Sequence, residues 1–220
     1  MVRLICLLIG YGCGLFQTSY IYGKSKGIDI RELGSGNAGT TNALRELGPK
    51  AGAITFLGDC LKCVISVLIV KLIFGNSYAD CIKLLGLYAG AGTILGHNFP
   101  FYMNFKGGKG IAATGGLVLS FDWRLTLIAL AAFVLAFLIT KYVSVGSLLV
   151  YVVFLSGMIY FGQRGLFNVE QRYLNEMYFL TFLLMVLAFY RHKDNIKRLL
   201  KGEEKKTYLS SKNKQKAMEE

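Results

Sequence analysis

Two loops contain most of the residues whose types and spacing could bind an anion. Loop 23–51 includes the stretch SGNAGTTN, and loop 96–116 includes FKGGKG. Glycine allows several backbone N–H groups to converge on one anion, and hydroxyl groups and cations can complete such a site. Both loops therefore predict an anionic ligand, and phosphate is the natural candidate.

The first loop satisfies the G-x-G-x-x-G pattern from Gly34 to Gly39, and Asp59 follows 20 residues later. A dinucleotide fold would require a buried strand before the glycines. The preceding KSKGIDIREL is no such strand, and Asp59 lies inside an apolar block. The pattern instead predicts a turn followed by a short helix, with Arg45 reaching back as a phosphate clamp. The alternative is an ordinary capped helix with a solvated arginine.

The second loop resembles part of a nucleotide-binding P-loop but departs from it at two positions. Gly110 follows Lys109 where Ser or Thr is required, and Met103 replaces the first glycine. Nucleotide hydrolysis is therefore not supported. A lysine within a glycine turn at a helix start still suits a phosphate or an oxyanion, whereas Lys106 could simply be a topogenic charge.

Three polar features near the apolar blocks allow two interpretations each. His97 could be a general base or could hold the glycine loop by hydrogen bonds. Asp59 and Lys62, one helical turn apart, could be functional or could neutralise each other near the headgroups. The pair Cys60 and Cys63 could bind a metal, but without a second cysteine pair we interpret both as packing residues. No metal and no cofactor is predicted.

The pattern of hydrophobicity predicts an all-α, polytopic integral membrane protein. The chain is 54% apolar, and blocks of roughly 20 apolar residues must span as helices, because the bilayer cannot satisfy backbone polar groups. We expect about seven transmembrane helices, with five or six as the alternatives, although the fourth block is too short to span alone. The blocks are 2–22, 52–74, 82–103, 111–121, 125–140, 143–162 and 177–190.

The positive charge gathers on one side of this predicted topology. With seven spans and the N-terminus outside, most of the 25 Lys and Arg residues fall in loop 23–51, loop 96–116, Lys141 and the segment from Arg191. Cytoplasmic faces carry this excess. The net charge of +12 is thus explained by the membrane, with its lipids as partners, and no nucleic acid is expected. The glycine-rich loops are predicted to be cytoplasmic.

Domain organisation is simple. We expect one transmembrane domain, 1–206, and a mobile basic cytoplasmic tail, 207–220, which is polar and rich in lysine.

In combination, these segments resemble the bacterial acyl-phosphate-dependent glycerol-3-phosphate acyltransferases, the PlsY family. The resemblance runs from the first block to about residue 204. The matching segments are SGNAGTTN at 35–42 with Arg45, GHNFPFYMNFKGGKG at 96–110, YVSVGS at 142–147 and RHKDNIKRLL at 191–200.

The resemblance implies transfer of an acyl group from acyl phosphate to glycerol 3-phosphate, giving 1-acylglycerol 3-phosphate and phosphate, the first step of phospholipid synthesis. It implies a bacterial plasma-membrane enzyme with its active site on the cytoplasmic side. Whether a soluble enzyme that makes acyl phosphate docks on the basic tail is left open. The implied catalytic residues are Ser35, Arg45, His97, Lys109, Ser144 and Asn195. The implied substrate-binding residues are Gly36, Asn37, Gly39, Thr41, Asn42, Gly107, Gly108, Gly110 and Thr114.

Two questions stay open at the level of sequence. The base that takes the hydroxyl proton is either His97 or a substrate phosphate, and the lack of a carboxylate placed to orient the histidine favours the phosphate. A transporter for a phosphorylated solute is the main alternative function. The lack of an inverted repeat and the clustering of polar motifs on one face argue against it. A pure anchor protein would leave the glycine-lysine loops without a purpose.

Overall fold

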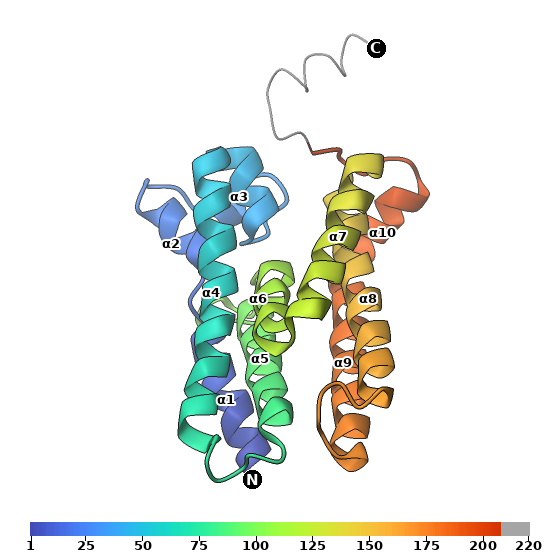
Figure 1. Cartoon of the computed structure of the whole chain (residues 1–220). Helices are drawn as coiled ribbons and strands as arrows, with labels where there is room; N and C mark the ends of the chain where they lie inside the picture. The colour runs from blue at the N-terminus through green and yellow to red at the C-terminus, as the bar shows by residue number, and fades with distance from the viewer. Residues whose placement is uncertain (208–220) are drawn as a thin grey trace.

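A computed structural model describes residues 1–207, in which all regular secondary structure is helical and no β-strand occurs. The long helices run side by side, with α2, α3 and α10 at one end, hereafter the loop end, and the N-terminus at the other (Figure 1). The helices are α1 (Val2–Gly14), α2 (Thr18–Lys24), α3 (Thr40–Leu47), α4 (Pro49–Phe74), α5 (Ile82–Asn98), α6 (Ile111–Phe121), α7 (Trp123–Thr140), α8 (Val143–Gln163), α9 (Gln171–Arg191) and α10 (Lys193–Leu200).

Five segments of the described chain are long and apolar enough to cross a membrane. They are Val2–Lys24, which includes α1 and α2, and the helices α4, α7, α8 and α9. Helix α5 has 17 residues and α6 has 11, both shorter than the roughly 20 residues of a typical span. The prediction of a polytopic all-α membrane protein is confirmed, whereas the count of seven is not. The predicted short fourth block is indeed a short helix.

Two predicted blocks end earlier than expected, each for a local reason. The first block breaks between α1 and α2, where Gln17 is extended and its side-chain amide donates to the carbonyls of Gly14, Gly96 and His97. The third ends at Asn98 instead of residue 103. Phe99 leaves the helical region there, as expected of a residue before a proline.

Glycines bring α1 and α5 into backbone contact. A Cβ atom on Gly10 would lie 1.9 Å from the carbonyl oxygen of Ala89, and one on Gly92 would lie 2.0 Å from that of Leu7. Small residues at helical spacing allow this approach between membrane helices. The close packing fixes α5, and hence the loop that follows it, relative to the first helix.

Candidate active site

The glycine-lysine loop folds back on the C-terminal end of α5. The N–H of Gly107 donates to Asn98 O at 3.2 Å, and that of Gly108 donates to His97 O at 3.2 Å. On the other side, Arg191 of α9 donates to the carbonyls of Gly107 and Gly108 at 3.1 and 2.9 Å. The amides of Gly107 and Gly108 therefore serve the fold and are not free for a ligand.

The loop leaves no room for a side chain at Gly107. A Cβ there would lie 2.0 Å from His97 O and 2.7 Å from Pro100 Cδ, whereas a Cβ on Gly115 would meet nothing within 4 Å. Overpacking costs about 1–3 kcal/mol when the backbone must shift. We expect Gly107→Ala to lower the kcat/KM of product formation at least tenfold, because it displaces Lys109. Gly115→Ala should stay near the wild-type value, and equal losses in both variants would contradict this geometry.

The loop ends at the positive end of a helix. Gly110 adopts a left-handed conformation (φ +80°), and the first intrahelical hydrogen bond of α6 runs from Thr114 N to Gly110 O. The N–H groups of the first turn precede that bond and are available to an anion. Lys109 stands at the same point, so one short segment offers both an ammonium group and helix N–H groups.

A chain of hydrogen bonds links Lys109 to α8 and α10. Its ammonium donates to Asn195 Oδ1, and Asn195 Nδ2 donates to Glu204 Oε1 at 2.6 Å. Ser144 Oγ donates to the same carboxylate oxygen at 3.1 Å. Arg198 Nε donates to Glu204 Oε2 at 2.7 Å. The structure thus brings three predicted residues, Lys109, Ser144 and Asn195, to one place and adds Arg198 and Glu204, which the sequence did not single out.

Burial lowers the pKa of Lys109 to about 8, although the Glu204 carboxylate opposes this shift. The ammonium form is present below that pH and is lost as the pH rises through it. We therefore expect kcat/KM, which reports on the free enzyme, to fall between pH 8 and pH 10. A Lys109→Arg variant that keeps activity should lack this alkaline limb, because guanidinium stays charged. If kcat/KM of Lys109→Arg falls above pH 8 as in wild type, the group that titrates is not Lys109.

The first glycine-rich loop is organised by Asn42. Its amide nitrogen donates to the carbonyls of Ile30 and Leu33 at 3.2 and 3.0 Å, and its oxygen accepts from the N–H of Ser35 at 3.0 Å. Asn37 donates to Ser35 Oγ at 3.2 Å. Asn42 therefore positions the loop, while Ser35 itself is exposed. Of the other predicted positions, Gly36 is in the loop turn at φ +69°, and Gly39 and Thr41 lie at the start of α3.

The two glycine-rich loops pack against each other. A Cβ on Gly108 would lie 2.7 Å from Ala38 O and 2.2 Å from His97 Nε2, so Gly108 is in contact with the first loop. Arg45, in α3, is directed to the C-terminal segment, where it donates to Lys205 O at 3.0 Å and to Thr207 Oγ1. Burial lowers the pKa of Arg45, and Glu204 counteracts this.

The segment just after α10 is part of the site. Thr207 is only 4% exposed, and its N–H donates to Lys141 O at 3.0 Å. Thr207, the first residue of the predicted tail 207–220, is thus packed against the end of α7 in the structure. The rest of that predicted tail, 208–220, lies outside the described residues.

His97 lies beneath the glycine-lysine loop in a buried network. Lys62 Nζ contacts His97 Nδ1 at 2.8 Å, Asp59 Oδ1 at 2.8 Å and Phe16 O at 2.7 Å. Thr18 donates to Asp59 Oδ1 at 3.0 Å. The predicted pairing of Asp59 with Lys62 is confirmed, but the pair is buried rather than placed among headgroups. A protonated Lys62 can only donate to Nδ1, and this assigns the ring proton to Nε2, the atom beside Gly108.

Thr114 is buried between helices. It is fully buried, and its hydroxyl group contacts Gly110 O at 2.9 Å and the hydroxyl of Tyr151 in α8 at 2.5 Å. A hydroxyl on an apolar helix commonly bonds the carbonyl four residues back. Its place beneath the first turn of α6 fits a role in joining α6 to α8, in contrast to the expected contact with phosphate.

His192 is a site residue that sequence reasoning missed. It is 3% exposed, and its Nδ1 lies 2.8 Å from Ala188 O, to which it donates. Burial lowers the pKa of His192 to about 4, and the charge of Lys109 adds to the shift. The ring is therefore neutral with an unprotonated Nε2. The sequence did place His192 three residues before Asn195 in the RHKDN stretch. The surrounding basic residues made the whole stretch look like a simple membrane anchor, so His192 was not singled out.

The described residues show no group of three or more His, Cys, Asp or Glu side chains that could hold a metal ion. Within residues 1–207 the groups gathered around Lys109 are cations, amides, helix N–H groups, the Ser144 hydroxyl and the Glu204 carboxylate.

Fold and site together define an integral membrane protein in which two glycine-rich loops and a cluster of cations meet at the loop end of the helices. The glycerol-3-phosphate acyltransferase family profile matches residues 4–202. Relatives include the glycerol-3-phosphate acyltransferase of Thermoanaerobacter sp. (strain X514), 41% identical over 94% of this chain and 96% of the relative, and glycerol-3-phosphate acyltransferase 2 of Thermotoga maritima, 41% identical over 92% and 95%.

Two solved structures share the fold over nearly the whole chain. Both are crystal structures of PlsY (YgiH), an integral membrane glycerol 3-phosphate acyltransferase, and both are 30% identical to this chain. The glycerol 3-phosphate form has a TM-score of 0.79 and covers 94% of this chain and 96% of that one. The lysophosphatidic acid form has a TM-score of 0.77, with coverage of 95% and 97%. The chain belongs to the glycerol-3-phosphate acyltransferase family.

Proposed function

We propose that this protein transfers a fatty acyl group from acyl phosphate to glycerol 3-phosphate, releasing 1-acylglycerol 3-phosphate and inorganic phosphate. The observation that carries the proposal is the position of Lys109 at the N-terminal end of α6, bonded to Asn195 and close to further cations. Two substrates that each bear a phosphate need such a density of positive charge. Solved relatives in glycerol 3-phosphate and lysophosphatidic acid forms support the acceptor and the product.

The chemistry suits a site built from donors. The 1-hydroxyl oxygen of glycerol 3-phosphate attacks the acyl carbon, the bond from that carbon to the phosphate oxygen breaks, and the hydroxyl proton leaves with a phosphate. Acyl phosphate already carries a good leaving group, so orientation of the hydroxyl and stabilisation of the tetrahedral oxyanion supply most of the catalysis. Fixed N–H groups and an ammonium group are suited to both tasks.

We assign roles by position. Lys109 and the first N–H groups of α6 bind a phosphate and the oxyanion, and Ser35 and Arg45 contribute from the first loop. Asn195 orients Lys109, and Ser144 supports the same cluster through Glu204. The remaining loop residues shape the site. They are Gly36, Asn37, Gly39, Thr41, Asn42, Gly107, Gly108, Gly110 and Thr114.

A substrate phosphate acts as the base in this proposal, and His97 positions the loop. His97 is 3% exposed, its Nδ1 contacts Lys62 and its Nε2 lies beside Gly108, an arrangement that favours a role in holding the loop. We expect His97→Ala to raise the KM for glycerol 3-phosphate and to lower thermal stability, while most of the turnover survives at saturating substrate. A drop in turnover by a factor of about 100 or more, in protein shown to be folded, would restore the histidine-base hypothesis.

The loop end faces the cytoplasm of a bacterial plasma membrane in this proposal. Exposed lysines gather there, including Lys24, Lys26, Lys50 and Lys106, as the positive-inside rule predicts. A soluble enzyme that makes acyl phosphate could dock on the basic segment after α9. Labelling of a single added cysteine at Lys26 in sealed vesicles, with the native cysteines replaced, would test the orientation.

The direct test uses the purified full chain in lipid, with labelled glycerol 3-phosphate as acceptor. Palmitoyl phosphate should give labelled 1-acylglycerol 3-phosphate and one equivalent of phosphate, and palmitoyl-CoA should give neither. If product forms from palmitoyl-CoA and not from palmitoyl phosphate, the protein is still an acyltransferase, but its donor is acyl-CoA instead of acyl phosphate. No product from either donor, with folded protein, would refute the acyltransferase and favour the transporter alternative. Uptake of labelled glycerol 3-phosphate into vesicles would then be measured.

A further inference from the structure

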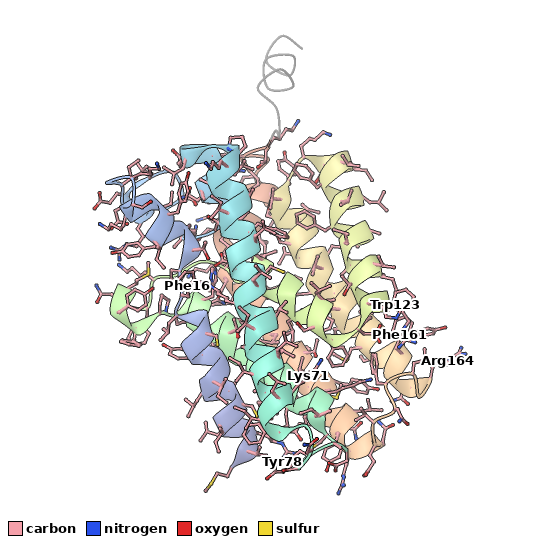
Figure 2. The ribbon with its side chains drawn as sticks, turned by 60° about the vertical axis from the view of Figure 1, so that its left-hand side comes forward. Phe16, Lys71, Tyr78, Trp123, Phe161 and Arg164 are labelled. Atoms are coloured by element: carbon pink, nitrogen blue, oxygen red, sulfur yellow. The ribbon has the colours of Figure 1, made fainter. Side chains whose placement is uncertain are left out.

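A second basic site lies at the end of the helices opposite the loops. An open pocket of about 240 Å³ is lined by the C-terminal turns of α4 and α6 and the first turns of α5. Val67, Ile82, Leu117 and Phe121 give it apolar walls, and Lys71 and Lys83 also line it. None of these six residues belongs to the active site, and all lie away from the loop end. Lys71 is labelled on α4 in Figure 2.

Both lysines keep N–H groups for a further ligand. Lys71 Nζ donates to Ser120 O at 3.0 Å, and Lys83 Nζ donates to Phe167 O at 2.6 Å. An ammonium group has three N–H donors, so each lysine uses one on a backbone carbonyl. Within residues 1–207 neither lysine forms an ion pair, and Asp122, which influences Lys83, is held by Arg124 at 2.7 Å.

Two cations beside apolar walls favour an amphipathic anion. Their repulsion is relieved by a negative group placed between them, and the low-dielectric surroundings strengthen that attraction. Free phosphate would leave the apolar walls without a partner. A zwitterionic headgroup would bring its own cation to the two lysines. In a membrane, lipids with net negative charge combine a phosphodiester with acyl chains and satisfy both parts of the cavity.

We propose that this cavity binds the headgroup of one anionic glycerophospholipid from the surrounding bilayer. The phosphodiester lies between Lys71 and Lys83, and an acyl chain packs along Val67 and Leu117. The site is independent of acyl transfer, because its residues are separate from those around Lys109. Helix α6 is nevertheless shared, since its first turn belongs to the active site and its last turn lines this cavity.

The single tryptophan of the chain provides the probe. Trp123 is 68% exposed and follows Phe121 by two residues, and Figure 2 labels it together with Lys71. The full chain is reconstituted in phosphatidylcholine, and its fluorescence is quenched by brominated phosphatidylglycerol or, separately, by brominated phosphatidylcholine. The ratio of the two half-quenching mole fractions measures preference for the anionic lipid.

We expect wild type to prefer phosphatidylglycerol at least fivefold, because one lysine near a membrane surface contributes about 1 kcal/mol, a factor of about five. Lys71→Gln and Lys83→Gln should each remove most of this preference. The matched control is Arg164→Gln, which removes an exposed charge outside the cavity and should keep it. Lys71 is exposed, so its replacement leaves the fold intact even if Lys83→Gln does not fold.

Three results would overturn the proposal. The first is equal quenching by both lipids in wild type. The second is an equal loss of preference in Arg164→Gln, which would indicate general surface charge. The third is full displacement of phosphatidylglycerol by inorganic phosphate beyond the effect of sodium chloride at matched ionic strength, which would identify a free-anion site instead of a lipid site.

Discussion

Replacement of Lys109 by methionine should lower kcat/KM for acyl transfer by about 10²–10³-fold. Loss of one preorganised donor to a developing oxyanion has an effect of this size in other enzymes. Lys109 is half-buried at the N-terminal end of α6, where its ammonium bonds Asn195. Methionine keeps much of the side-chain volume and removes only the charge and the donors, so protein folding should be preserved.

The chain offers a matched control for Lys109 three residues earlier. Lys106 lies in the same loop but is exposed, and Lys106→Met removes the same charge. We expect its kcat/KM to stay within a factor of about two of wild type, because exposed charges contribute little. Steady-state kinetics with palmitoyl phosphate and glycerol 3-phosphate measure both variants. Comparable losses would show that overall positive charge, and not the position of Lys109, governs activity.

The contrast between these lysines shows what the sequence could predict. The unusual combination of glycines with Lys109 at a helix start was sufficient to separate it from Lys106. Ser144 and Asn195 followed from the resemblance, and the structure brings both to Lys109 through hydrogen bonds. Membrane topology helps such predictions, because polar segments between apolar blocks must gather at one of two ends.

The sequence did not predict which polar groups face inward. Thr114 and Asn42 were expected to meet substrate, yet their hydrogen bonds join α6 to α8 and hold the first loop. His97 allowed two interpretations at the level of sequence, and the expected lack of a carboxylate near it was wrong: Lys62 Nζ and Asp59 Oδ1 lie 2.8 and 3.6 Å from its Nδ1. Side-chain direction depends on tertiary contacts that periodicity does not encode.

Two of the helix boundaries that differed from the predicted blocks have local causes. A buried amide at Gln17 interrupts an apolar block that hydropathy treats as continuous, because its side chain satisfies backbone carbonyls of α5. Hydropathy likewise did not predict where α5 ends, since Phe101–Met103 after Pro100 are apolar but form a separate 3-10 turn instead of continuing the α-helix.

Glu204 was missed for a different reason. An acidic residue in a lysine-rich segment is usually solvated, and nothing in KGEEKK distinguishes it from Glu203. In the structure the Glu204 side chain is only 6% exposed and accepts from Asn195, Ser144 and Arg198, whereas Glu203 is exposed. Hydrogen bonds from these groups lower the pKa of Glu204 and outweigh the opposing effect of burial, so its carboxylate stays charged.

Glu204→Ala should therefore damage both stability and activity. Removal of one partner from a buried charge cluster costs about 3 kcal/mol, which corresponds to a fall in Tm of roughly 5–10 °C for a chain of this size. Asn195 would lose its acceptor and Lys109 its neighbouring negative charge, so we expect kcat/KM to fall at least 100-fold. Glu203→Ala, one residue away, should match wild type in both measurements.

The pair of variants also separates two roles for the Glu204 carboxylate. If Glu204 is a scaffold, Glu204→Ala lowers Tm and raises the KM for glycerol 3-phosphate together. If instead the carboxylate competes with substrate phosphate for Arg198 and Lys109, the variant keeps its Tm and binds glycerol 3-phosphate more tightly. The contacts favour the scaffold, because Glu204 joins α8, α10 and Asn195 in one network, and the segment that follows it holds Arg45. Thermal unfolding in detergent and calorimetric titration with glycerol 3-phosphate, performed on the same preparation, distinguish these outcomes.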